Sequence, residues 1–512
     1  MTPPEPGAHA VGSEPERGRF AKTGLALGVL AVLLTLTVEP PEGLTVPAWR
    51  LVGVTLLMAC WWISEAIPIP ATALVPLALF PLLGITSVSE AGEPYGHRVV
   101  FLLMGGFMIA LAMQRWGLHR RIALNVVSRV GGGPRRVVAG FMLPAAFLSM
   151  WISNTAAATM MVPIGLSVLA LFQQDPGMSD RDKSAFACAL MLGIAFAANV
   201  GGMSTLIGTP PNAVLAGVMQ ETFGYQIGFV EWLAVGLPMT IVFLPLIWIV
   251  LTYVCFAVPG GGGAHHHERI AADTRALGPL SRAEITVLLT LLVTAGLWLA
   301  RRTLNELAPG LGINDTSIAV CGALALFLIP VGRDAEGRRE FALNWATAMR
   351  LPWGVILLLG GGFSLAAAIK STGLATWIGD GTTVVAVLPV LGLLFLVTLL
   401  VVFLTEINSN TATTATFIPV LAAVAVSIGE NPLLLCIPAT FAASAAFMLP
   451  IATAPNAVVF ASGHVPSSSM LRAGLVLNPL ATLVIVALLW FLLGPALGVV
   501  PGEFPDWAVN PA

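Results

Sequence analysis

Two related stretches, SMWISNTAAATMMVPI at residues 149–164 and TEINSNTATTATFIPV at residues 405–420, place the same polar triplet Ser-Asn-Thr inside long apolar runs. Hydroxyl and amide groups in hydrocarbon must be hydrogen-bonded or must line a cavity. A single triplet is equally well explained as a hydrogen-bonding contact between packed membrane helices. Because the triplet occurs twice, we expect the two copies to form two halves of one polar site at membrane depth.

The composition around these stretches is that of a polytopic α-helical membrane protein. Hydrophobic residues make up 57% of the 512 positions and charged residues 10%, whereas about a quarter of a typical soluble domain is charged. Apolar runs of about 18 residues or more recur along the chain, without the alternation typical of a transmembrane barrel. The net charge of -2 and the dispersed basic residues argue against a nucleic-acid partner.

Basic residues predict how the chain crosses the membrane. The apolar run 137–172 has arginine or lysine near both ends, so we expect both ends on the cytoplasmic side. Each arm about its Ser-Asn-Thr spans only about 25 Å as a helix, which favours a re-entrant hairpin over two crossings. The run 385–428 repeats this design from the opposite side. The remaining segments predict eleven crossings of the cell membrane, with the N-terminus in the cytoplasm and the C-terminus outside. Of the 24 Lys and Arg residues, those that this topology leaves at the outer side are Arg50, Arg98, Arg301, Arg302 and Lys370.

The two halves of the chain repeat each other, and an odd number of predicted crossings separates equivalent points, so the repeats are inverted. A second pair of motifs, Thr-Pro-Pro-Asn at 209–212 and Thr-Ala-Pro-Asn at 453–456, lies 244 positions apart. Inverted repeats with interrupted helices are typical of transporters that alternate access around a site near the bilayer midplane. The pairs that lie 256 positions apart are Gly106 and Gly362, Gly117 and Gly373, Ser153 and Ser409, and Pro163 and Pro419.

Four polar breaks in apolar helices carry the predicted chemistry, namely the two Ser-Asn-Thr tips and the two later turns. Glycine and proline unwind a helix and free backbone carbonyl groups, which then face a cation. Helices that restart after such breaks point their amide ends into the gap, where an anion binds. Oxygen ligands without a carboxylate suit sodium. A cation and an anion in one site indicate coupled uptake.

Together these motifs resemble the divalent anion:sodium symporter family. The resemblance rests on the two Ser-Asn-Thr stretches with NVGGMSTLIGTPPNA (199–213) and FMLPIATAPNAVVFASG (447–463), and it extends over nearly the whole chain. Members carry di- and tricarboxylates, and some carry sulfate. The resemblance implies an all-α polytopic fold with two re-entrant hairpins in two inverted repeats. It also implies a homodimeric transporter, not an enzyme, with sodium as coupling ion and no cofactor, whose transport domain moves like an elevator against a scaffold.

The resemblance assigns the site residue by residue. One sodium site is expected at Ser149, Ser153, Asn154 and Gly202. A second is expected at Thr405, Asn408, Asn410 and Ala452. The substrate carboxylates are expected at Ser153, Asn154, Thr155, Ser409, Asn410, Thr411, Thr453 and Ala454. Members that carry C4-dicarboxylates often have proline at the position of Ala454, and its loss leaves more room in the site.

The predicted division of the chain follows the two repeats. We expect four scaffold helices, a transport half with the inward hairpin, three further scaffold helices, and a transport half with the outward hairpin. Two tails and one cytoplasmic loop complete the chain. The expected boundaries are 1–20 (disordered cytoplasmic tail), 21–122 (scaffold helices 1–4), 123–257 (first transport half), 258–282 (cytoplasmic loop), 283–380 (scaffold helices 7–9), 381–501 (second transport half) and 502–512 (extracellular tail).

The leading hypothesis is sodium-coupled import of a C4-dicarboxylate such as succinate, malate or fumarate. A sodium-coupled sulfate or tricarboxylate (citrate or tartrate) symporter and a dicarboxylate exchanger are the alternatives. A proton antiporter would need paired acids at depth, where only Glu406 is a candidate, and Glu406 is also explained as a brace of the hairpin. An intramembrane enzyme would need a nucleophile–base pair or a metal triad. Asn212 and Asn456 are equally well explained as structural caps or as ligands.

Overall fold

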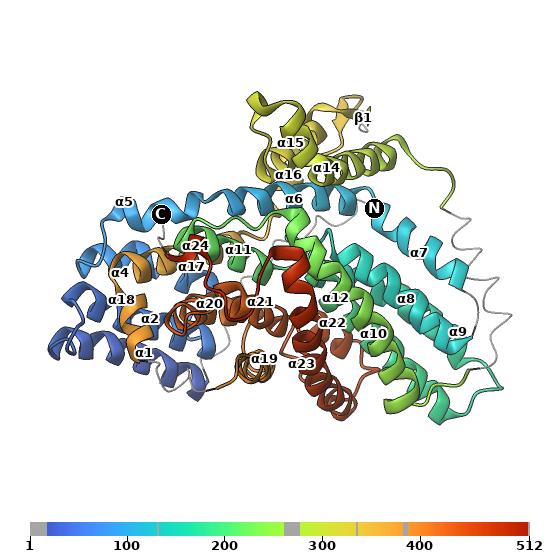
Figure 1. Ribbon diagram of the computed structural model, residues 1–512. Helices are drawn as coiled ribbons and strands as arrows, with labels where there is room; N and C mark the ends of the chain where they lie inside the picture. The colour runs from blue at the N-terminus through green and yellow to red at the C-terminus, as the bar shows by residue number, and fades with distance from the viewer. Residues whose placement is uncertain (1–17, 131–132, 261–276, 334–335, 382–387, 510–512) are drawn as a thin grey trace.

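The chain is almost entirely helical in the computed structural model (Figure 1). Among the described residues the one sheet is a hairpin of β1 (Pro330–Arg333) and β2 (Arg339–Phe341), paired antiparallel. Ten described helices are long and apolar enough to cross a membrane, by length and composition. The predicted all-helical membrane fold is therefore confirmed, whereas the eleven crossings stay a prediction. The structure describes residues 18–130, 133–260, 277–333, 336–381 and 388–509.

The first helices form one edge of the molecule (Figure 1). The antiparallel pair α1 and α2 packs closely because Gly53 of α2 leaves room for the side chain of Thr35. Thr45 begins α2 as its N-cap, with its hydroxyl accepting a hydrogen bond from Ala48 N. The elements in this part are α1 (Arg19–Thr37), α2 (Val46–Ser64), α3 (Ile69–Thr72), α4 (Val75–Leu82), α5 (Val88–Gly92), the 3-10 helix η1 (Glu93–Gly96) and α6 (Arg98–Arg115).

Both Ser-Asn-Thr triplets lie at the turn between two consecutive helices, as the sequence predicts. The first hairpin consists of α8 (Pro134–Ser149) and α9 (Asn154–Gln173). The second consists of α19 (Val390–Leu404) and α20 (Asn410–Ser427). A serine precedes the second helix of each hairpin as its N-cap, a position where serine is strongly preferred. The tip of each hairpin therefore ends one helix and starts the next at equivalent points of the two repeats.

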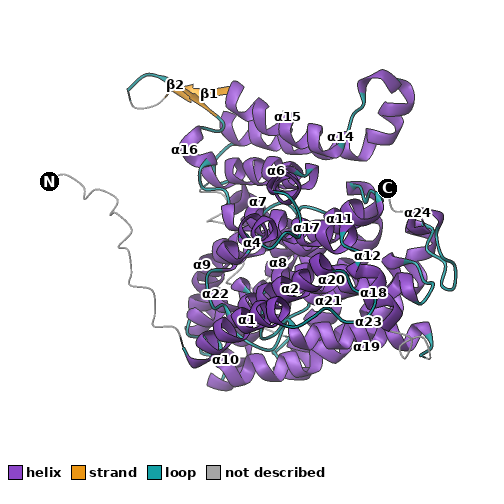
Figure 2. Cartoon of the chain, turned by 90° about the vertical axis from the view of Figure 1, so that its left-hand side faces the viewer, coloured by secondary structure: helices purple, strands orange, loops and turns teal. Residues whose placement is uncertain are grey.

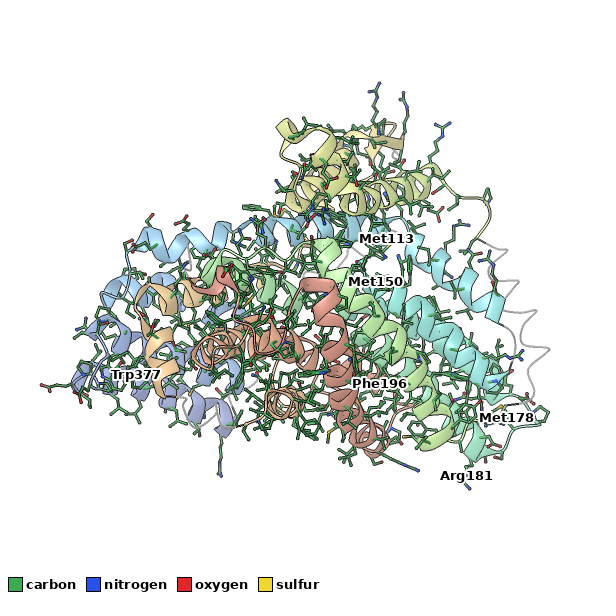
Figure 3. The ribbon with its side chains drawn as sticks, viewed as in Figure 1. Met113, Met150, Met178, Arg181, Phe196 and Trp377 are labelled. Atoms are coloured by element: carbon green, nitrogen blue, oxygen red, sulfur yellow. The ribbon has the colours of Figure 1, made fainter. Side chains whose placement is uncertain are left out.

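Two helices are broken at the motifs that follow the hairpins. The first is divided into α10 (Asp180–Met203) and α11 (Pro210–Phe223), and the second into α21 (Pro432–Ala443) and α22 (Ala454–Ala461). Proline stands in the first turn of α11 and α22, where its missing N–H costs nothing. The apolar length of α10 is wholly buried. In Figure 3, Arg181 at its start lies at the rim of the molecule and Phe196 lies among the packed helices.

The other long helices surround this centre. Helices α12 and α23 pack against each other, and α12 also packs on α10. Helices α14 and α15 lie on α6, apart from most of the other helices in both views (Figures 1 and 2). The remaining elements are α12 (Phe229–Ile249), the π-helix η2 (Val250–Cys255), α14 (Arg282–Leu307), the 3-10 helix η3 (Pro309–Leu311), α15 (Asp315–Leu328), α16 (Trp345–Ala348), α17 (Trp353–Ser371), α23 (Ser467–Leu497) and α24 (Asp506–Val509).

Two amphipathic helices were missed by the search for apolar runs. α7 (Leu118–Val130) follows Gly117, and α18 (Leu374–Gly381) follows Gly373 at the equivalent point of the second half. Both glycines have positive φ, 68° and 78°, the left-handed conformation in which glycine ends a helix. The expected boundary between residues 122 and 123 falls inside α7. Of the expected tails, loop and second transport half, residues 1–17, 261–276, 382–387 and 510–512 lie outside the described residues.

Candidate functional site

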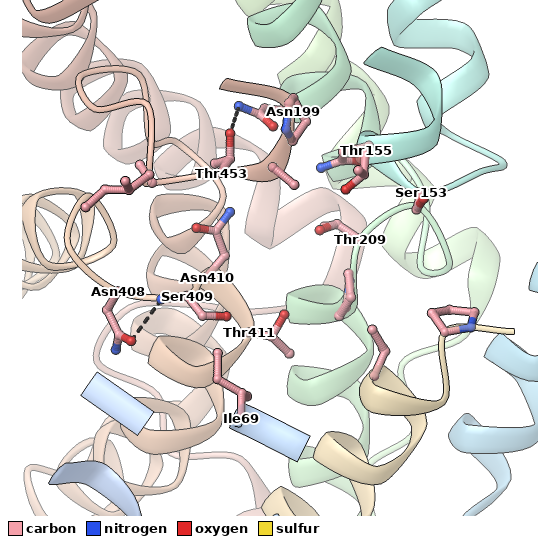
Figure 4. A pocket seen from close by; sticks show the side chains of 18 of the residues that line it. Ile69, Ser153, Thr155, Asn199, Thr209, Asn408, Ser409, Asn410, Thr411 and Thr453 are labelled. Carbon is pink, nitrogen blue, oxygen red and sulfur yellow. Dashed lines mark hydrogen bonds between the residues drawn. The ribbon is translucent and has the colours of Figure 1, made fainter. Parts of the chain in front are cut away.

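A cavity of about 800 Å³ lies where the two hairpin tips and the two broken helices meet (Figure 4). Every predicted substrate-binding residue lines this cavity. Two further polar residues that the sequence analysis left without a role, Asn199 and Thr209, also line it. The opposite wall comes from α1, from the end of α2 and the start of α3, and from α6 and α17. The residues that form it are Phe20, Ile63, Ser64, Glu65, Ile69, Phe107, Pro352 and Val355.

Four helices begin at the wall of this cavity. They are α9, α11, α20 and α22, and their N-caps are Ser153, Thr209, Ser409 and Thr453. The first turn of a helix has free amide N–H groups and carries about half a positive charge. No lysine, arginine or histidine is among the described lining residues, and the one acid, Glu65, is exposed. The described lining therefore offers an anion helix N-termini and neutral polar side chains in place of basic residues.

The predicted first sodium site contains closely packed oxygen atoms. Ser149 is fully buried, and its Oγ donates a hydrogen bond to Asn154 Oδ1 at 2.6 Å. The Asn154 amide lies directly against Gly202, so a Cβ at Gly202 would overlap it. Ser153 lies at the cavity wall, where its Oγ accepts a hydrogen bond from Ala156 N at 3.3 Å. The structure thus brings Ser149, Asn154 and Gly202 into contact and places Ser153 beside them.

The predicted second sodium site has a similar arrangement. Thr405 Oγ1 lies 2.7 Å from both Asn410 Oδ1 and Ala443 O. A hydroxyl group has one hydrogen, so three oxygen atoms share a single proton, and such a group suits a cation that takes oxygen ligands. Asn408 instead accepts a hydrogen bond from Ser409 N at 2.8 Å, while Ala452 lies at the cavity wall. The Ala443 carbonyl was missed because a backbone oxygen leaves no signal in the sequence.

The two repeats make the same bonds at equivalent positions. The pairs Ser149–Asn154 and Thr405–Asn410 lie 256 positions apart, as the Ser-Asn-Thr motifs do. Asn212 donates its amide N–H groups to Gly202 O and Thr205 O, and Asn456 donates in the same way to Ala446 O and Leu449 O. Both asparagines are buried and hold the carbonyl groups that the helix breaks set free. The bonds favour structural caps over ligands for Asn212 and Asn456.

Glu406 is the ionisable residue that the sequence places near the second tip, and the structure shows it as a brace. Its carboxylate accepts hydrogen bonds from three successive backbone N–H groups in the break between α21 and α22, and a fourth from Asn478 of α23. It is 3% exposed and does not line the cavity. The brace joins the hairpin tip to the broken helix. The equivalent residue in the first half is Met150, so only the second half has this brace.

A cavity formed by two hairpin tips and two broken helices, inside a bundle of membrane-length helices, is typical of a membrane transporter. A model of the family described as "Sodium:sulfate symporter transmembrane region" matches residues 20–500, and the chain belongs to this family.

Individual relatives agree with this assignment. The chain is 39% identical over 484 residues to the sodium-dependent dicarboxylate transporter SdcS of Staphylococcus saprophyticus, covering 93% of this chain and 92% of that one. It is 38% identical over 485 residues to the protein of the same name from Staphylococcus aureus strain USA300, with the same coverage. The crystal structure of the Alcanivorax borkumensis YdaH transporter matches 94% of this chain and 97% of its own, with a TM-score of 0.53 and 15% identity. This last likeness concerns the fold alone.

Proposed function

We propose that this protein imports C4-dicarboxylates such as succinate, malate and fumarate together with sodium ions. The observation that carries the proposal is the convergence of four helix N-termini on one cavity beside two clusters of oxygen atoms. The N-termini attract the carboxylates, and the oxygen clusters suit sodium. The relatives named as sodium-dependent dicarboxylate transporters support the same cargo.

In this proposal each hairpin tip serves both cargoes. The substrate carboxylates bind at the two Ser-Asn-Thr tips and at Thr453 and Ala454. The side-chain oxygens of Asn154 and Asn410 face sodium, so each ion adds positive charge beside a carboxylate. Binding of the dianion without sodium is therefore weak, because two negative charges would meet only partial positive charges. This dependence couples the two fluxes. The proposed sodium residues are Ser149, Ser153, Asn154 and Gly202, and Thr405, Asn408, Asn410 and Ala452.

Alternating access would move the hairpins and broken helices as a transport domain against a scaffold, in a homodimer in the cell membrane. Helices α1 and α17 begin at the cavity, and α2 ends there. The distribution of basic residues assigns these three helix ends to the cytoplasmic side. This supports an inward-facing state for the present structure, with a cytoplasmic N-terminus and an outer C-terminus. The proposed scaffold comprises residues 21–122 and 283–380, and the proposed transport halves comprise 123–257 and 381–501.

Uptake by the purified protein in liposomes tests the proposal. Labelled succinate should accumulate only with an inward sodium gradient, and replacing sodium by potassium should stop it. Equal uptake in potassium would contradict sodium symport and favour an exchanger. A panel of succinate, malate, citrate, tartrate and sulfate as competitors identifies the anion. Stronger inhibition by sulfate or citrate than by succinate would replace the C4-dicarboxylate with one of those anions.

Single substitutions test the site itself. Asn154→Ala and Asn410→Ala should each remove sodium-dependent succinate uptake, because each deletes an oxygen ligand and a tip amide together. Asn125→Ala serves as the control, since Asn125 lies on α7 outside the cavity and donates to the Arg121 carbonyl. Full uptake by both tip variants would show that the tips only hold helices together.

A further inference from the structure

We infer that Asn199 is a positioning residue, which holds the Thr453 hydroxyl so that its hydrogen is donated to a substrate carboxylate. This inference rests on the proposed function and adds a residue to it. Asn199 lies in α10, is fully buried and lines the cavity. Figure 4 shows its amide nitrogen bonded to Thr453, whose side chain is at the start of α22.

The orientation of the Asn199 amide follows from its neighbours. Asn456 Nδ2 lies within hydrogen-bond distance of two backbone carbonyls, Ala446 O at 3.2 Å and Leu449 O at 3.1 Å. Carbonyl oxygens only accept, so the Asn456 NH2 group must face them and its Oδ1 must face away. Asn456 Oδ1 lies 3.3 Å from the Asn199 amide. Asn199 must therefore present its own NH2 group there, which also donates to Thr453 Oγ1 at 3.1 Å.

Thr453 thus receives two N–H donors on one hydroxyl oxygen. The second donor is Asn456 N, at 3.2 Å. A hydroxyl oxygen has two lone pairs and one hydrogen, so both lone pairs are occupied and the hydrogen is left to donate. No described residue accepts that hydrogen, and Thr453 lines the cavity. The hydroxyl is therefore prepared to donate to an anion before the anion arrives, which lowers the cost of binding.

The other half of the cavity lacks this device. The equivalent threonine, Thr209, makes no capping bond with its side chain. The residue that lies 244 positions after Asn199 is Ala443, which has no donor side chain. In addition, Asn199 Oδ1 is buried without a partner among the described residues, a cost that an apolar residue would avoid. The NH2 group of Asn199 thus distinguishes this position from Ala443 in the other half. It orients the hydroxyl group of Thr453 and has no counterpart at Thr209.

The test exchanges the donor for an acceptor. In Asn199→Asp an ionised carboxylate takes the Thr453 hydrogen for itself, so KM for succinate should rise about tenfold or more, as expected for losing a hydrogen bond to a charged group. A buried carboxyl group holds its proton strongly, and when protonated it donates as the amide does. The KM of Asn199→Asp relative to the unmodified protein should therefore fall again as the pH is lowered from about 8 to about 6. A purely structural defect would not recover with pH.

Variants of Thr453 complete the test. Thr453→Val removes the hydroxyl group and should raise KM about tenfold, whereas Thr453→Ser keeps the hydroxyl group and should raise KM less than Thr453→Val does. Adding Asn199→Asp to Thr453→Val should raise KM by a smaller factor than Asn199→Asp alone does, and that factor should recover less at low pH. The hydroxyl group that couples the two residues is then gone, and only the repulsion between the added carboxylate and the substrate remains. Glu65, Glu406 and the substrate are the same in every variant, so their effects cancel in the comparison.

The outcomes separate this inference from the proposed function. If the unmodified protein takes up no succinate with sodium, the proposed function fails. If the unmodified protein does take up succinate with sodium, but the KM of Asn199→Asp equals that of the unmodified protein at every pH, the proposed role of Asn199 is overturned. Should Asn199→Asp not yield folded protein, Asn199→Ala decides by the same measurement. It should raise KM about threefold to tenfold, since the free lone pair lets the hydroxyl turn away, and an unchanged KM would overturn the inference.

Discussion

At the scale of single residues, the surroundings of Gly202 explain why the predicted first sodium site has a glycine at this position. The Asn154 side chain lies where a Cβ of residue 202 would stand. The carbonyl oxygen of Gly202 also accepts a hydrogen bond from Asn212 at 3.1 Å, so its backbone is fixed from the other side. The Asn154 amide lies at the cavity wall and would have to turn away from Ser149 to make room. A side chain here would displace Asn154 from Ser149 and open the proposed ion site.

We therefore expect Gly202→Ala to raise the sodium concentration for half-maximal uptake about tenfold or more, which corresponds to about 1.4 kcal/mol lost from ion binding. The measurement is uptake of labelled succinate against sodium concentration. Gly296→Ala is the matched control, because a Cβ at Gly296 meets no atom within 4 Å. Sodium dependence of Gly202→Ala equal to that of the control would place the ion elsewhere.

At the scale of elements, the break between α21 and α22 is held open by residues of other elements. Glu406 binds the N–H groups of Phe447, Met448 and Leu449, while Asn456 binds the carbonyls of Ala446 and Leu449. A broken helix buried in a membrane protein is stable only when such freed groups have partners. These bonds keep the start of α22 directed at the cavity. The brace therefore links the stability of the second half to its binding geometry.

Glu406→Gln should lower the thermal stability of the protein. Glutamine offers one acceptor oxygen in place of two and brings an NH2 group against backbone N–H donors, and each donor left unpaired costs about 1–3 kcal/mol. Thermal unfolding of the purified variant measures the effect, with the exposed Glu503→Gln as control. Equal melting temperatures of the two variants would show that the carboxylate is not a brace.

At the scale of the whole molecule, polar contacts join the proposed scaffold to the proposed transport domain away from the cavity. Arg301 of α14 lies 3.4 Å from Glu231 of α12 and 3.3 Å from Asp315 of α15, and Phe229 N donates to Asp315 at 2.9 Å. Arg98 of α6 donates to Gln220 of α11. The predicted topology places all of these groups at the outer face, opposite the cavity mouth. Outward movement of the transport domain would require these contacts to break.

Crosslinking across this contact tests whether the two parts move. In a protein with its native cysteines replaced, Arg98→Cys and Gln220→Cys joined by a short bifunctional thiol reagent should stop succinate uptake. Each single cysteine treated in the same way should leave uptake intact, since one attachment pins nothing. Continued uptake by the fully crosslinked protein would contradict movement of α11 against α6.

The sequence predicted the elements of the site more completely than its bonds. Both hairpins turn where the Ser-Asn-Thr motifs indicate, and the Thr-Pro-Pro-Asn and Thr-Ala-Pro-Asn turns begin α11 and α22. These features depend on apolar length, proline and N-cap chemistry, which act within a few residues. The amphipathic helices α7 and α18 were missed because the search relied on uninterrupted apolar length.

The sequence alone determined that this is a helical membrane protein with two repeated polar tips, because the cost of polar groups in hydrocarbon depends on local composition. Only the tertiary structure decided which groups those tips meet. Asn199 and Thr453 are 254 residues apart, and Glu406 and Phe447 are 41 apart. Their contacts arise from how α10, α21 and α22 pack around one cavity, and no local pattern contains that packing.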